Sequence, residues 1–145
     1  MTHIEFLILA NHAEAKEGLL YVLGGGWTDH WRQVPKGGPI PASHFGVGVG
    51  VIVEWTDTNR PHHLTIRFET DDGKEVGRVE GDLEVGRPPG LPAGSDQRAV
   101  LAFNGDFQWP SSGGYRVVAR LGSDSATDKI VRFRVHDQPL EVTGR

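Results

Sequence analysis

The fold is decided by residues 44–55, which read His-Phe-Gly-Val-Gly-Val-Gly-Val-Ile-Val-Glu-Trp. Every second residue from position 45 is large and apolar, and the positions between them include Gly46, Gly48 and Gly50. This alternation predicts a β-strand, because successive side chains of a strand point to opposite faces. We expect the apolar face to lie in a core. The glycine face should lie against close backbone neighbours or beneath large side chains of adjacent strands.

Similar alternation elsewhere brings the expected number of strands to about eight. The other predicted strands are 3–10, 18–27, 63–70, 74–85, 98–107, 115–121 and 129–136.

The connections between these strands carry turn chemistry. Asp71-Asp72-Gly73 lies between two alternating runs and predicts a hairpin turn. Segments 32–41 and 86–96 are longer and rich in Pro and Gly, so we expect them to carry the chain between two sheets. Segment 11–17 has the composition of a short helix, and it is the only such stretch.

Composition supports the same fold class. The chain has 145 residues with 20 Gly, 9 Pro and no Cys. This length suits one domain, and one residue in five disfavours a helix. We therefore predict an all-β, single-domain antiparallel β-sandwich, immunoglobulin-like or C2/jelly-roll-like, with at most one short helix. The domain spans 1–145, with its core at about 3–136 and a C-terminal tail at 137–145.

Charge and the N-terminal sequence limit the expected partners. The net charge of −4 argues against a protein that binds nucleic acid through the phosphate backbone. The apolar run at 6–10 is too short for a signal peptide or a membrane span. We expect a cytoplasmic protein with neither a nucleic-acid nor a membrane partner.

Several segments together are similar to a known family. They are Leu-Gly-Gly-Gly-Trp-Thr at 23–28, Asn-Arg-Pro-His-His-Leu at 59–64 with Asp-Asp-Gly at 71–73, Val-Gly-Arg-Pro-Pro-Gly-Leu-Pro-Ala-Gly-Ser at 85–95, Gly-Tyr at 114–115 and Phe-Arg-Val at 133–135. Over residues 3–136 the chain resembles a family of small, uncharacterised bacterial β-sandwich proteins known only as a domain of unknown function. The resemblance implies a single cytosolic β-sandwich and brings no activity, ligand or catalytic residue.

Two tryptophans suggest a small-ligand site. Trp27 and Trp31 bracket His30, beside a Pro- and Gly-rich loop. Two indoles could form a stacking platform for a sugar or another flat ligand. The alternative is that Trp27 closes one end of the core while Trp31 lies on the loop. The preceding Gly24-Gly25-Gly26 lacks the Lys of a phosphate-binding loop, and is read as a bulge or sharp turn.

Evidence for a metal site or for catalysis is weak. His62 and His63 are adjacent, so in a strand they point to opposite faces and need further ligands, with His30 and His44 as possible helpers. No cofactor is expected, and the Gly-x-Ser-x-Gly motif of a serine nucleophile is absent. Carboxylates in predicted turns could bind calcium only if their loops converge. They are Asp57, Asp71, Asp72 and Asp124.

A non-catalytic binding module fits these observations best. The expected partner is a protein or a second copy of the chain, with Gly46, Gly48 and Gly50 as interface candidates because a glycine face permits close approach. The first alternative is a small-ligand or carbohydrate-binding module that uses Trp27 and Trp31. The second is a metal-dependent enzyme.

Overall fold

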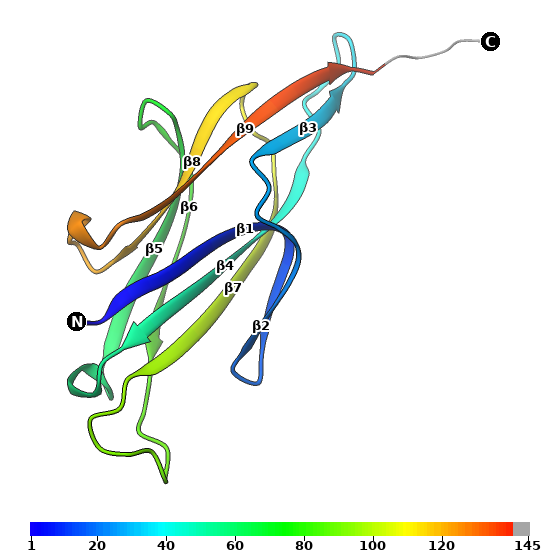
Figure 1. Ribbon diagram of the computed structural model, residues 1–145. Helices are drawn as coiled ribbons and strands as arrows, with labels where there is room; N and C mark the ends of the chain where they lie inside the picture. The colour runs from blue at the N-terminus through cyan, green and yellow to red at the C-terminus, as the bar shows by residue number, and fades with distance from the viewer. Residues whose placement is uncertain (141–145) are drawn as a thin grey trace.

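The computed structural model describes residues 1–140 and is built almost entirely of β-strands (Figure 1). The described residues form nine strands in two sheets, with two short 3-10 turns, η1 (Trp55–Asp57) and η2 (Ser125–Thr127). The all-β prediction is confirmed, with nine strands in place of about eight.

Each sheet has its own strand order. Sheet A has four strands in the order β2 (Leu19–Gly25), β1 (His3–Lys16), β4 (Ser43–Val53) and β7 (Gln97–Phe107). Sheet B has five, in the order β3 (Asp29–Val34), β9 (Lys129–Pro139), β8 (Gly113–Leu121), β5 (Pro61–Thr70) and β6 (Glu75–Glu84).

One apolar core lies between the two sheets. Val47, Val49, Val51 and Val53 of β4 are at most 1% exposed, as their alternation predicts. They belong to one cluster with apolar residues of β1 from the same sheet and of β5, β8 and β9 from sheet B. Trp109, in the β7–β8 connection, is fully buried in this cluster. Five aromatic rings lie with their centroids 4.6–5.9 Å from it: Phe45, Phe68, Phe107, Tyr115 and Phe133.

The expectation of a helix at 11–17 is wrong. Residues 10–16 continue β1 and pair with 19–25 of β2 in an antiparallel hairpin. The turn places Glu17 and Gly18 at φ 52° and 76°, which is the two-residue geometry that matches the twist of a hairpin. A seven-residue segment has little intrinsic helical stability, so the β-ladder prevails.

The purely antiparallel prediction is also wrong at one strand. The alternation pattern does not predict β3, because segment 29–34 mixes polar and apolar residues on both faces. It pairs with β9 in parallel, from Asp29 opposite Arg134 to Val34 opposite Pro139. β9 therefore continues to Pro139, into the region expected to be a tail. Of that tail, residues 141–145 lie outside the described residues.

The predicted connections are otherwise confirmed. Residues 71–73 turn the chain between β5 and β6. The segment between β3 and β4 and the segment between β6 and β7 each carry the chain from sheet B to sheet A.

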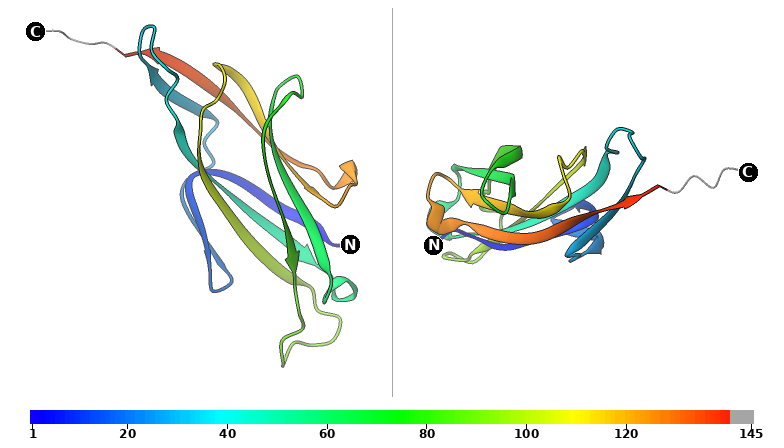
Figure 2. Two further views of the ribbon diagram at one scale, coloured as in Figure 1. Left: turned by 180° about the vertical axis from the view of Figure 1, so that it is seen from behind. Right: turned by 90° about the horizontal axis from the view of Figure 1, so that it is seen from above.

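The glycine face of β4 is covered by residues of the same chain. Beyond Ala10, β1 leaves its pairing with β4, and the β1–β2 hairpin runs beside β7 (Figures 1 and 2). A Cβ at Gly46 would lie 2.7 Å from the backbone nitrogen of Ala13, and one at Gly48 would lie 2.8 Å from Leu20 Cδ2. The Phe6 ring occupies the same space over Gly50.

Asn104 of β7 fastens the hairpin in this position. Its side-chain carbonyl accepts from the Ala13 N–H at 2.9 Å, and its amide donates to the Ala13 carbonyl at 2.6 Å. The three glycines thus allow a partial third layer to lie on the outer face of sheet A.

We predict that Gly46→Ala destabilises the protein. The new methyl group would meet backbone atoms of residues 12 and 13 within 3.0 Å, and backbone cannot move aside without breaking the Asn104 contacts. We expect the free energy of unfolding to fall by about 1–3 kcal/mol, measured by urea denaturation.

Gly105→Ala in β7 is the matched control, because no atom lies within 4 Å of its added Cβ. It should change the free energy of unfolding by less than about 0.5 kcal/mol. Equal stabilities of the two variants would contradict the close hairpin contact.

Candidate functional site

The free edge of β2 is the most apolar surface of the hairpin. Leu19, Tyr21 and Leu23 occupy alternate positions of this strand, and they are 58%, 55% and 68% exposed. Leu20 and Val22 are less exposed and point to the other face, where Leu20 packs over Gly48. One face of β2 therefore holds the hairpin against β4, and the opposite face presents three large side chains to solvent.

β2 differs from the other edge strands in charge. The edges of the two sheets are β2 and β7 in sheet A and β3 and β6 in sheet B. β2 contains no charged residue and no proline from Leu19 to Gly25. The other three edges all carry charges, including Asp29 and Arg32 in β3, Arg78, Glu80 and Asp82 in β6, and Arg98 and Asp106 in β7. Charges and prolines are the usual means of keeping an edge from pairing with another chain, and β2 lacks both.

The β1–β2 ladder determines which backbone N–H and C=O groups of β2 point to the free edge of the sheet. Ala13 lies opposite Val22 in the β1–β2 ladder, and its N–H and C=O both bond to the Asn104 side chain. The Ala13–Val22 pair is therefore a non-hydrogen-bonded pair of the antiparallel ladder. By alternation, Leu20 and Val22 direct their N–H and C=O groups to the free edge of the sheet.

The second candidate region contains the predicted ligand residues. Trp27, His30 and Trp31 all line an open pocket of about 360 Å³. The Trp27 ring packs edge-on against Phe133 of the core at 5.4 Å. Trp31 instead stacks on His136 of β9 at 4.1 Å, with the ring planes 17° apart. The two indoles thus have different stacking partners and do not form one shared platform.

His30 lines the inner side of this pocket, next to the buried residue Ser43. Its Nε2 lies 2.7 Å from the Ser43 hydroxyl. Burial, followed by the charge of Arg32, lowers the pKa of His30 from its usual value. Arg32 is itself buried, pairs with Asp137 and donates to the Trp109 carbonyl at 2.6 Å. These contacts anchor β3 to the core.

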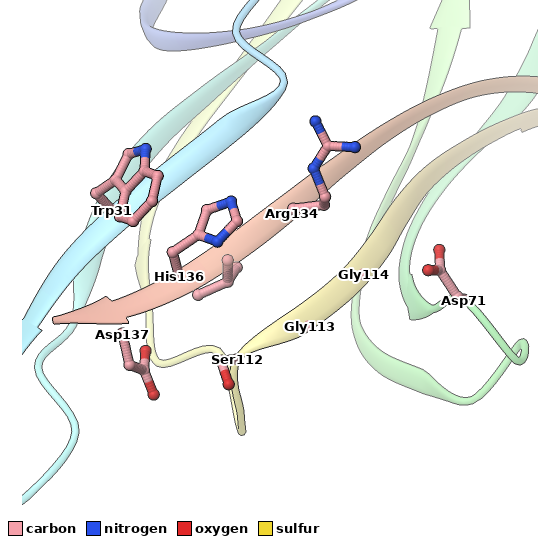
Figure 3. A pocket seen from close by; sticks show the side chains of 9 residues that line it. Trp31, Asp71, Ser112, Gly113, Gly114, Arg134, His136 and Asp137 are labelled. Atoms are coloured by element: carbon pink, nitrogen blue, oxygen red, sulfur yellow. The ribbon is translucent and has the colours of Figure 1, made fainter.

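A larger open pocket, also lined by Trp31, lies over β9 and the start of β8 (Figure 3). Its volume is about 450 Å³, and its lining includes Trp31, Asp71, Ser112, Arg134 and His136. Of these, only Trp31 was a predicted ligand-site residue. The alternation of 129–136 predicts an outward face for Arg134 and His136, but Trp31 comes beside them only through the unexpected parallel β3–β9 pairing.

Asp29 organises the polar side of this pocket. Its carboxylate accepts from Arg134 Nε at 2.8 Å and Nη2 at 3.1 Å, and from His136 Nε2 at 2.7 Å. These bonds, with the Arg134 bond as the largest cause, hold the pKa of Asp29 well below its usual range. Asp29 therefore fixes the ring of His136 on which Trp31 stacks.

The histidines considered for a metal site are separated. His62 Nε2 lies 2.7 Å from the Asp57 carbonyl, whereas His63 bonds to Asp82, and this bond raises the pKa of His63. His44 contacts a further histidine, His12, at 3.2 Å. Across residues 1–140, no group of three or more His, Cys, Asp or Glu side chains is arranged to hold a metal ion. The calcium candidates lie in different turns: Asp57 in η1, Asp71 and Asp72 between β5 and β6, and Asp124 before η2.

The interface candidates Gly46, Gly48 and Gly50 lie beneath the hairpin and Phe6 and are buried. Any partner that approached this face would therefore meet those covering side chains first.

We predict that the stability contributed by Asp29 depends on pH. Its pKa is lower in the folded chain than in the unfolded chain, so ionised Asp29 stabilises the fold above about pH 4, and this contribution is lost as the pH falls through the folded pKa. The difference in free energy of unfolding between wild type and Asp29→Asn should shrink as the pH falls below about 4.

Urea denaturation over a series of pH values measures this difference. Asp96→Asn, at an exposed position of the β6–β7 connection, is the control and should stay within about 0.5 kcal/mol of wild type. A wild-type advantage over Asp29→Asn that did not change with pH would contradict the role of the Asp29 carboxylate.

Comparison with known proteins adds a family and no function. A search of curated proteins found no match. Within residues 1–140, no helix is long and apolar enough to cross a membrane. A family model described as a family of unknown function, DUF6941, matches residues 5–136. The match spans most of the chain, including both candidate regions, and the chain therefore belongs to this family.

Proposed function

We propose that this protein is a non-catalytic interaction module that binds a second copy of itself through the free edge of β2. The observation that carries the proposal is the composition of that edge: it has no charge and no proline, and three of its apolar side chains are more than half exposed. Such an edge is a template for pairing with another strand.

The sequence of β2 is suited to pairing with itself. Leu19-Leu20-Tyr21-Val22-Leu23 is apolar and nearly symmetric about Tyr21. In an antiparallel pair centred on Tyr21, Leu19 lies opposite Leu23 of the second copy and Leu20 lies opposite Val22. A two-fold interface requires this kind of self-complementarity.

The same register satisfies the backbone. Leu20 and Val22 direct their N–H and C=O groups to the free edge, and the proposed pairing places them opposite Val22 and Leu20 of the second copy. Tyr21 then forms a non-hydrogen-bonded pair with its own counterpart, with the two Cα atoms about 4.5 Å apart. The two copies of sheet A join into one continuous sheet.

The affinity should be moderate. One short strand pair with its flanking side chains is smaller than the ~1,200–2,000 Å² interface of most stable complexes. We therefore expect a dissociation constant of about 1–100 μM.

The proposal also covers the setting and the fold type. We propose a cytoplasmic, bacterial protein, as the family resemblance implies, with neither a nucleic-acid nor a membrane partner. The net charge of −4 supports the absence of a nucleic-acid partner. The Tyr115 hydroxyl donates to the Ser111 carbonyl at 2.6 Å, and this contact supports an immunoglobulin-like sandwich, where a tyrosine near a strand start bonds back to the backbone. A C2/jelly-roll-like order remains the alternative. A metal-dependent enzyme has no supporting site within residues 1–140.

We predict that Tyr21→Cys forms a disulfide-linked dimer under mild oxidation. The chain contains no cysteine, so the introduced thiol has only its counterpart in the second copy to react with. Opposed Cα atoms about 4.5–5.5 Å apart suit a disulfide. Non-reducing gel electrophoresis measures the linked fraction, and light scattering of the unmodified protein measures its mass against concentration.

Leu19→Cys is the matched control, because the same register places the two copies of residue 19 about 13 Å apart. It should cross-link far less than Tyr21→Cys, although it is equally exposed. Equal cross-linking of the two variants would show that the thiols meet by random collision of the chains, and would contradict the proposed register. A wild-type protein that stays monomeric at concentrations above about 100 μM would contradict self-association.

A further inference from the structure

Two histidines face each other where the β1–β2 hairpin lies on the outer face of sheet A. His12 belongs to the hairpin, and His44 lies at the start of β4. His12 Nδ1 and His44 Nε2 are 3.2 Å apart, and the two ring planes are 21° from parallel. The two side chains are 37% and 51% exposed. The pair therefore joins the hairpin to the sheet at a position that an ion can reach from solvent.

A carboxylate lies at the far nitrogen of each ring. His12 Nε2 is 3.2 Å from Glu14 Oε1, and His44 Nδ1 is 2.9 Å from Asp106 Oδ1. An ionised carboxylate only accepts hydrogen bonds, and a neutral imidazole has one N–H to donate. Each neutral ring therefore directs its N–H to its carboxylate. The two nitrogens that face each other then both carry lone pairs.

This arrangement is completed by a cation between the two rings. Two facing acceptors make an unfavourable contact, which either a shared proton or a metal ion bound to both nitrogens would relieve. Neutral imidazole is a common ligand of zinc, copper and nickel. Two nitrogens that each lie about 2.0–2.1 Å from a tetrahedral zinc ion are about 3.3 Å apart. The observed 3.2 Å is close to this spacing, and a modest turn of the exposed rings directs both lone pairs to one ion.

His63 on β5 shows the contrast. Its Nδ1 lies 2.7 Å from Asp82 and its Nε2 lies 3.4 Å from Glu80. Both of its nitrogens thus face carboxylates rather than a second imidazole. Its side chain is 46% exposed, so it is as accessible as His12 and His44 and differs from them in having no paired ring.

We propose that His12 and His44 bind one divalent transition-metal ion, such as zinc, while Glu14 and Asp106 orient the two rings. Carboxylates that accept the far N–H of a ligating histidine are the usual outer partners of such ions. Water completes the coordination, because within residues 1–140 no three ligating side chains converge.

The site suits a structural role. Catalytic zinc sites use three protein ligands, and this one has two. The ion would link the hairpin to β4, as Asn104 links the hairpin to β7. Both ligands belong to one chain, so the proposal does not depend on pairing at the β2 edge.

Zinc titration of the unmodified protein at about pH 7.5, above the usual titration range of histidine, tests the proposal. In imidazole ¹H–¹⁵N spectra, zinc should shift the signals of His12 Nδ1 and His44 Nε2 and leave those of His63 unchanged. Calorimetry should give one ion per chain, with a dissociation constant of about 1–100 μM. Magnesium, which prefers oxygen ligands, should give neither result.

Zinc should also raise the Tm of the wild-type protein. The two histidines are 32 residues apart in the chain and come together on folding, so an ion that binds both stabilises the folded state. His44→Ala should abolish this rise and weaken zinc binding by at least about tenfold.

Two further variants separate this site from other histidines. Asp106→Asn should weaken zinc binding by about tenfold, because His44 loses its orienting carboxylate. His63→Ala is the control and should bind zinc as tightly as the wild type. The proposal would be overturned by unshifted His12 and His44 nitrogens, by shifts confined to His63, by one ion per two chains, or by wild-type affinity in His44→Ala.

Discussion

The structure depends on the absence of side chains at three positions of β4. Gly46, Gly48 and Gly50 leave room on the outer face of sheet A for the Ala13 backbone, Leu20 and the Phe6 ring. Any Cβ at the first two would approach these atoms within about 3 Å, closer than packed atoms permit. A strand with valines on one face and glycines on the other can therefore contribute to the core and also support the hairpin as an outer layer.

The position of the hairpin determines which surface the molecule offers. Because Leu20 faces inward over Gly48, its neighbours Leu19 and Tyr21 face solvent. Sheet B has a different surface: its outward side chains form ion pairs, such as Arg134 with Asp29 and Arg116 with the buried Glu69. One sheet thus presents an uncharged edge, and the other presents a polar face with a single exposed indole.

Strand content and the core could be predicted from alternation, and Val47 to Val53 lie where their pattern places them. The helix expected at 11–17 could not be corrected from local sequence, because the hairpin turn and the Asn104 contact outweigh a weak propensity. β3 escaped prediction because its sequence does not alternate. Its parallel pairing with β9 brings Trp31 onto His136. Of the residues that line the larger pocket, the sequence therefore singles out only Trp31, as a ligand residue, and Asp71, as a calcium candidate. The glycine face was identified from the sequence, but the chain itself covers it.

The account is tested most directly by amide hydrogen exchange in β2 at two protein concentrations. The backbone amides of Tyr21 and Leu23 point toward β1 and should be protected at both concentrations. Leu20 and Val22 direct their amides to the free edge, so they should exchange quickly in dilute solution and slow as the concentration rises above about 100 μM. Exchange at Leu20 and Val22 that stays fast at every concentration would contradict edge pairing. Protection of both at the lowest concentration would contradict the free edge itself.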